Sequence, residues 1–160
     1  TGERTFEAAA YLRRHGADPG LVHKLFRDEM ATVVQRAKLV ADARIPIPGL
    51  AVSVYKNAPS GDNTSVILAQ AADELVTMSE VKVSVVMAET ENELLVSARS
   101  DGSVNVQTIM EELGGGGHQT VAGVQLKGVH ADEVEPQIIE LTKKQMEERE
   151  TNESNITARY

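Results

Sequence analysis

The sequence predicts an α/β domain with a mixed central sheet of four or five strands flanked by helices, preceded by a helical segment. In residues 50–126, short stretches with the two-residue period of strands alternate with stretches of helical period. Residues 1–43 have helical periodicity alone, and the two prolines of Arg44-Ile45-Pro46-Ile47-Pro48-Gly49 end it. The change of pattern at these prolines is the basis for separating a helical part from an α/β part.

Two helices are expected in the N-terminal part. Apolar side chains at helical spacing predict a helix over residues 1–14, and residues 15–18 interrupt it. A long second helix is expected from Pro19 to Ala37, with Asp18 as its N-cap. Its apolar positions are Leu21, Val22, Leu25, Phe26, Met30, Val33, Val34 and Ala37.

The domain organisation follows from the same patterns. Residues 1–43 are interpreted as the end of a preceding domain with a connecting helix, and residues 44–49 as a linker because closely spaced prolines favour extended backbone. Residues 50–150 form the α/β domain, and the polar residues 151–160 are expected to be a frayed tail. Because the chain opens on Thr1 within a helical pattern, we expect it to be part of a longer protein.

Within the α/β domain, each element is expected from its periodicity and its flanking turn residues. The expected order is a strand at 50–56, a helix from Asp62 or Asn63 to about Met78, a strand at 81–88, a turn at 91–93, a strand at 94–100, a short helix capped by Ser103 or Asn105, a strand at 121–126 and a helix from His130 to about Glu150.

Composition excludes several classes of function. A net charge of −8 argues against a broad nucleic-acid surface, so DNA is not an expected partner, although a small anionic ligand in a local site is compatible with it. The absence of cysteine excludes disulfides and thiolate metal sites. With no Trp, two Phe and three Tyr, a base-stacking platform of the single-strand-binding type is not expected.

Four consecutive glycines and a histidine, Gly114-Gly115-Gly116-Gly117-His118, follow the short predicted helix. An ordered glycine costs roughly 0.5–1 kcal/mol relative to Ala, so an ordered run needs a compensating use. One use is phosphate binding by successive N–H groups, with the imidazole as a further donor. The other interpretation is a flexible loop that begins with Gly114 as a helix C-cap. The glycines alone leave both open.

Several segments together resemble a known family. Ser97-Ala98-Arg99-Ser100, the glycine run with His118, and Val121-Ala122-Gly123 resemble the C-terminal, DHH-associated domain of the DHH phosphoesterases. Residues 1–14 resemble the end of the catalytic DHH domain in the cyclic-di-AMP phosphodiesterases of the GdpP/YybT type. Gly123 is expected to permit close packing of its strand against the glycine run.

The resemblance implies hydrolysis of cyclic di-AMP to pApA by a two-metal centre, usually manganese, held by the DHH domain while the DHH-associated domain binds the substrate. This sequence has no Asp-His-His motif, and His15, His23 and His130 are expected to be surface or capping residues. We therefore expect no catalytic residue, metal ligand or cofactor in this chain and an inactive fragment on its own. The resemblance further implies a cytoplasmic domain of a bacterial membrane-anchored signalling enzyme.

The resemblance also implies which residues bind substrate. These are Arg99 and Ser100, with Ser97 as a further hydroxyl donor, and Gly114, Gly115, Gly116, Gly117 and His118. Arg4 and Thr5 either cap the first helix and face the substrate cleft or lie on a solvated helix start. The expected partners are an adenine dinucleotide and the DHH domain of the same chain, and a homodimer is left open.

Two alternative functions remain at this stage. One is another DHH phosphoesterase, acting as an oligoribonuclease on short substrates such as pApA or as a phosphoadenosine phosphate phosphatase. The other, from a different class, is a non-catalytic RNA-binding or dimerisation module, and the acidity of the chain counts against it.

Overall fold

The computed structural model describes residues 2–25 and 29–157. The chain divides into two compact units, Thr1–Val33 and Val34–Tyr160, and each is described by itself. In the described residues, no helix is both long enough and apolar enough to cross a membrane.

The N-terminal unit contains α1 (Glu3–Arg14), α2 (Pro19–Leu25) and the first turn of α3 (Met30–Ala41). The predicted cap of α2 is confirmed, because Oδ1 of Asp18 accepts a hydrogen bond from the Gly20 N–H at 2.8 Å. The prediction of one long helix is wrong, since α2 ends at Leu25 and α3 begins at Met30. Apolar spacing continues through both helices and so cannot reveal that they are separate. Phe26 lies outside the described residues.

The second unit is built on a six-stranded mixed sheet with the strand order β1-β2-β3-β4-β6-β5. Strands β2 (Leu50–Tyr55) and β3 (Val83–Glu89) are parallel and are joined by α4 (Asp62–Leu75). All other neighbours are antiparallel, including β3 with β4 (Glu93–Ser100) through the predicted hairpin. The α/β class and mixed sheet are confirmed, while the sheet in the described residues has six strands rather than four or five.

The two strands that were not predicted lie at the two edges of the sheet. The expected linker at residues 44–49 instead forms β1 (Arg44–Ile47) and a turn into β2, in which Gly49 has φ of +86°. Pro46 fits there because an edge strand does not need every N–H for pairing. At the opposite edge, β5 (Gly116–His118) pairs with β6 (Val121–Lys127).

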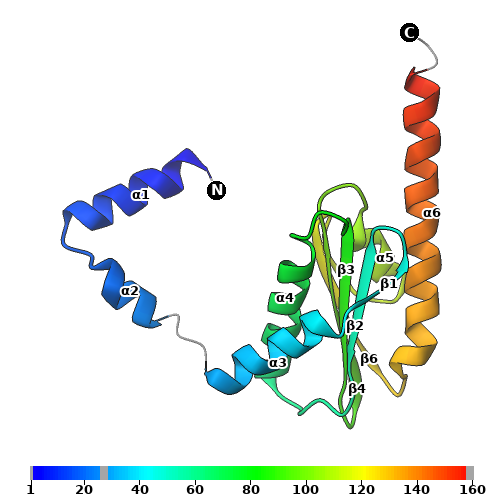
Figure 1. The fold of residues 1–160 in the computed structure, drawn as a ribbon, viewed down its shortest axis with the longest axis horizontal. Helices are drawn as coiled ribbons and strands as arrows, with labels where there is room; N and C mark the ends of the chain where they lie inside the picture. The colour runs from blue at the N-terminus through cyan, green and yellow to red at the C-terminus, as the bar shows by residue number, and fades with distance from the viewer. Residues whose placement is uncertain (1, 26–28, 158–160) are drawn as a thin grey trace. The chain divides into compact units, whose positions relative to one another are not determined.

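Each face of the sheet is covered by helices and has its own apolar core (Figure 1). Val83, Val85 and Met87 of β3 pack on the side of α5 (Val106–Glu112) and α6 (Ala131–Thr157). Val86 and Ala88 alternate with them and pack on the side of α3 and α4. Val81, which precedes β3, also belongs to the second core.

In the second unit, one of the two helix caps predicted for α4 and α5 agrees with the sequence. Asn105 caps α5, as predicted, by accepting a hydrogen bond from the Gln107 N–H at 3.1 Å. Helix α4 is preceded by Gly61, with φ of 140°, and not capped by Asp62 or Asn63. Glycine occupies this position because its φ lies in a region that other residues rarely adopt.

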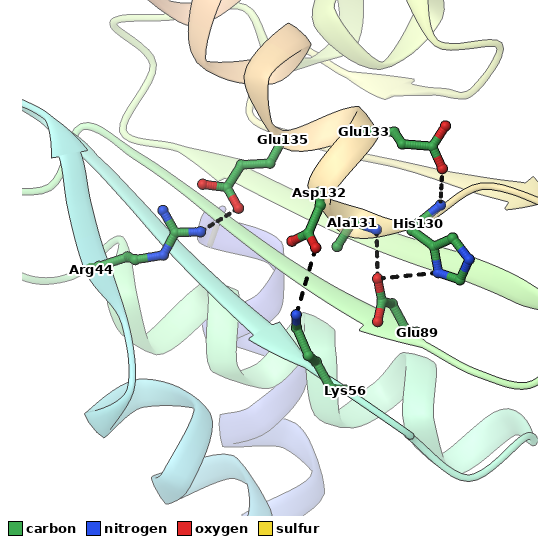
Figure 2. A network of polar contacts seen from close by, with 8 residues as sticks. All are labelled: Arg44, Lys56, Glu89, His130, Ala131, Asp132, Glu133 and Glu135. Atoms are coloured by element: carbon green, nitrogen blue, oxygen red, sulfur yellow. Dashed lines mark hydrogen bonds and ion pairs between the residues drawn. The ribbon is translucent and has the colours of Figure 1, made fainter.

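The N-terminus of α6 is joined to the sheet by polar contacts (Figure 2). Oε1 of Glu89, at the end of β3, accepts a hydrogen bond from the Ala131 N–H at 2.7 Å and lies 3.7 Å from Nδ1 of His130. Arg44 of β1 pairs with Glu135, and Lys56 with Asp132. The helix runs to Thr157, past the predicted end near Glu150.

Candidate substrate-binding face

Strand β4 divides its side chains between the two faces of the sheet. Leu94, Val96 and Ala98 are buried in the core beneath α5 and α6. By alternation, Leu95, Ser97 and Arg99 lie on the opposite face, where Leu95 contacts the core under α4. The predicted residues Ser97 and Arg99 therefore share a face.

The strand register places residues of β6 and of the glycine run on the same face as Ser97 and Arg99. Val121 of β6 is paired with Arg99 on one side and with His118 of β5 on the other, while Gly123 is paired with Ser97 and Gly116. Directly paired residues of antiparallel strands project to the same face. We call the six residues Ser97, Arg99, Gly116, His118, Val121 and Gly123 the open face.

The open face thus has two parallel rows of residues. One row is Arg99, Val121 and His118, and the other is Ser97, Gly123 and Gly116, which has small side chains or none. With neighbouring strands about 4.8 Å apart, the backbones of Arg99 and His118 are about 10 Å apart. A ligand of nucleotide size can contact both ends of the first row.

Three hydrogen bonds fix the guanidinium of Arg99. Nε donates to Oδ1 of Asp73 in α4 at 2.5 Å, and Nη1 donates to Oγ of Ser97 and to the carbonyl of Ala98, each at 3.0 Å. Among the described residues, Nη2 has no hydrogen-bond partner. Arg99 is therefore held in one orientation and retains a donor for a phosphate oxygen.

Most of the glycine run has a structural explanation. Gly114, with φ of +85°, follows the last residues of α5, and the N–H groups of Gly114 and Gly115 donate to the carbonyls of Glu111 and Met110. This is the Schellman motif, so the predicted C-cap is confirmed. A Cβ on Gly115 would lie 2.4 Å from the Gly123 carbonyl oxygen, and one on Gly117 2.4 Å from that of Val121.

Gly116 differs from its neighbours. A Cβ built on it meets nothing within 4 Å, and its φ lies outside the left-handed region. Neither backbone strain nor packing therefore requires glycine there. An ordered glycine needs a compensating use, and one such use is close approach of a ligand to the backbone. Of the four glycines in the run, Gly116 is the one for which this use is left.

The predicted role of Gly123, to permit close packing of its strand against the glycine run, is wrong. A Cβ on Gly123 would lie 2.8 Å from the carbonyl oxygen of Val96, which is in β4. The missing side chain of Gly123 therefore permits the close approach of β4, whereas the close packing of β6 against the glycine run is permitted by Gly115 and Gly117.

Ser100 does not lie with the other predicted site residues. It is buried, and its Oγ accepts hydrogen bonds from the N–H groups of Gly102 and Val104 at 3.0 and 3.3 Å. By alternation it projects to the face opposite Arg99. These contacts give Ser100 a role in the turn after β4.

Arg4 and Thr5 lie in the first turn of α1, in the N-terminal unit, and both are exposed. The N-cap of α1 is Gly2, so neither residue caps the helix. Of the other histidines, His15 bonds through Nδ1 to the Tyr11 carbonyl at 2.9 Å, and His130 precedes α6.

Two residues of this region were not singled out by the sequence. Asp73 carries no local signal, because only the packing of α4 beside β4 brings it to Arg99. Val121 lies within the motif that carries the resemblance, but its exposure of 44% and its position between Arg99 and His118 require the strand register.

The described residues do not fit a two-metal centre. They contain no group of three or more His, Asp or Glu side chains that could hold a metal ion. Such a centre needs clustered carboxylates and imidazoles, which the described residues do not provide.

Comparison with known families identifies the domain. The model of the DHHA1 domain matches residues 48–148. The chain belongs to the DHHA1 domain family. The match begins at the turn between β1 and β2 and ends within α6, and it includes the whole open face.

Two relatives of this DHHA1 domain confirm the resemblance to the GdpP type. The chain is 48% identical over 141 residues to the cyclic-di-AMP phosphodiesterase GdpP of Geobacillus thermodenitrificans. It is 44% identical over 141 residues to the cyclic-di-AMP phosphodiesterase PdeA of Listeria monocytogenes. These alignments cover 88% and 87% of this chain but 21% of each relative, so the chain spans about a fifth of their length.

A solved structure supports the fold of the DHHA1 domain chain. An exopolyphosphatase-related protein from Bacteroides fragilis superimposes with a TM-score of 0.75, over 94% of this chain and 46% of that one. At 14% identity, the likeness shows the fold alone.

Proposed function

We propose that this chain is the substrate-binding part of a phosphodiesterase that hydrolyses cyclic di-AMP to pApA. The observation that carries the proposal is the strand register, which places Arg99 and His118 at the two ends of one row on the open face. The names of the GdpP and PdeA relatives support the choice of substrate.

In this proposal, Arg99 binds one phosphate of the substrate. The guanidinium is a permanent cation whose planar N–H groups suit phosphate oxygens. Because Asp73 and Ser97 already fix its orientation, little side-chain entropy is lost when a ligand binds.

His118 and Gly116 bind the other end of the substrate. The imidazole of His118 is exposed and can donate a hydrogen bond to a phosphate oxygen. The open space above Gly116 lets a ligand reach the backbone, where N–H groups are donors to an anion. Together these groups bind and orient the dinucleotide.

Hydrolysis itself is assigned to the DHH domain of the longer protein. A two-metal manganese centre there would supply the attacking hydroxide and stabilise the leaving oxygen. This chain then forms the side of the substrate site that positions the phosphodiester at that centre. Alone it has no hydrolytic activity.

Calorimetric titration tests the proposal. Cyclic di-AMP is titrated into the unchanged chain, into the double variant Arg99→Ala, His118→Ala, and into Arg14→Ala, His23→Ala, a control that removes the same residue types from exposed positions in α1 and α2. We expect binding by the unchanged chain and the control, and at least a tenfold loss in the double variant.

Other outcomes contradict the proposal. Equal binding by all three proteins would remove the open face as the site. Tighter binding of pApA than of cyclic di-AMP would favour an oligoribonuclease. Release of pApA by this chain with Mn²⁺ would show that catalysis does not need another domain.

A further inference from the structure

Val121 is an exposed apolar side chain between two polar groups of the open face. It is 44% exposed, and its two directly paired neighbours are Arg99 and His118. A single exposed valine is ordinary on a protein surface. Its position is not ordinary, because any ligand that contacts both Arg99 and His118 must cross Val121.

The surroundings of Val121 leave room for a flat group. Helix α4 packs on β3 and β4, and its Asp73 pairs with Arg99 at the border of the open face, whereas Val121 is 44% exposed. The next residue of β6 on this face is Gly123, whose paired neighbours are Ser97 and Gly116. The methyl groups of Val121 therefore border a row with little or no side-chain volume.

We propose that Val121 is a specificity-determining residue that packs against the nucleobase of the bound nucleotide. This inference rests on the function proposed above. A phosphate bound by Arg99 or His118 brings its nucleoside over the same two rows of residues. The base is the apolar, planar part of that ligand, and its contact with Val121 removes both from water.

The role assigned to Val121 differs from that of the two polar residues. Arg99 and His118 interact with phosphate, so they affect every ligand that carries one. Val121 affects only ligands that carry a base. Nucleotides and sugar phosphates should therefore respond differently to the same substitution.

The matched variants are Val121→Thr and Val66→Thr. Threonine keeps the β-branched shape and suits a strand, but it replaces one methyl group by a hydroxyl. Val66 lies on α4 and is 48% exposed, so it is a similarly exposed valine outside the open face.

The test is an NMR titration, followed at the methyl and the backbone amide signals, of the unchanged chain and both variants with AMP and with ribose 5-phosphate, which lacks the base. In the unchanged chain, AMP should shift the Val121 methyl signals through the ring current of adenine, and ribose 5-phosphate should not. Val121→Thr should weaken AMP binding roughly three- to tenfold, as expected for the loss of one buried methyl contact. Val66→Thr should leave it unchanged.

Two results would overturn the inference, and they can be told apart. Shifts at His118 and Arg99 with both ligands, without movement of the Val121 methyl signals, would show phosphate binding without base contact and leave the proposed function standing. The absence of shifts at Arg99, His118 and Val121 with either ligand would reject the site and the inference together.

Discussion

Nε of Arg99 donates to Oδ1 of Asp73 at 2.5 Å, which joins β4 to α4 at the border of the open face. The Arg99 side chain is 11% exposed, whereas that of Asp73 is 61% exposed. The pair therefore orients Arg99 but contributes little to stability, because solvent screens the carboxylate.

Asp73→Asn is expected to change the free energy of unfolding by less than about 1 kcal/mol. The amide oxygen can still accept from Arg99, but the negative charge is gone, so Arg99 attracts phosphate more strongly. Affinity for cyclic di-AMP should rise a few-fold at low salt, and the gain should shrink as salt rises. Calorimetry at two salt concentrations and urea unfolding measure both effects.

Asp132→Asn is the control, because it makes the same change of net charge at a different ion pair. Asp132 lies in the first turn of α6 and pairs with Lys56. This variant should leave the affinity unchanged. Weaker binding by Asp73→Asn would mean that the charge of Asp73, and not only its geometry, supports the ligand.

Glu89→Ala should destabilise the domain by about 1–2 kcal/mol. Its carboxylate accepts the hydrogen bond of the Ala131 N–H at the start of α6 and is only 18% exposed, so its loss leaves a helix N-terminus without its acceptor. Lys56→Ala, which breaks an exposed pair at 3.8 Å, should cost less than about 0.5 kcal/mol. Urea unfolding of the two variants compares them, and equal costs would refute the role of Glu89.

Gly114→Ala should cost about 1 kcal/mol of stability, because an alanine at φ of +85° is strained even though its Cβ meets nothing within 4 Å. Gly114→Asn should recover part of this cost, since asparagine tolerates the left-handed region better. Thermal unfolding measures both. A larger cost for Asn than for Ala would show that side-chain volume, not φ, determines the choice of glycine.

The sequence predicted elements whose signals are local. The Asp18 cap, the Asn105 cap and the hairpin between β3 and β4 each depend on residues close in the chain. The three motifs Ser97-Ala98-Arg99-Ser100, the glycine run with His118, and Val121-Ala122-Gly123 led to the correct family because their order along the chain is specific.

The sequence could not predict what depends on pairing between distant strands. Strand β1 contains Pro46, and β5 is three residues long with two glycines, so neither has the periodicity of a strand. The same register determines the site, because it brings Val121 between Arg99 and His118. The alternation of side chains along β4 places Ser100 on the face opposite Arg99. This local signal could have excluded Ser100 from the predicted site.

Gly115→Ala and Gly116→Ala should have opposite effects. A Cβ on Gly115 would lie 2.5 Å from Cβ of Val124 and 2.4 Å from a backbone oxygen, so β5 and β6 must separate, at a cost of about 2–3 kcal/mol. A Cβ on Gly116 enters open space at an ordinary φ and reduces the entropy of the unfolded chain, so stability should stay the same or rise by up to about 1 kcal/mol.

Although Gly116→Ala should not destabilise the domain, it should weaken ligand binding. At a temperature where both variants are folded, Gly116→Ala should weaken cyclic di-AMP binding about tenfold, because the new methyl group occupies the space through which a ligand reaches the backbone. Urea unfolding and calorimetry on the same preparations give both quantities. Unchanged affinity in a folded Gly116→Ala variant would leave Gly116 without a ligand role and place the phosphate elsewhere on the open face.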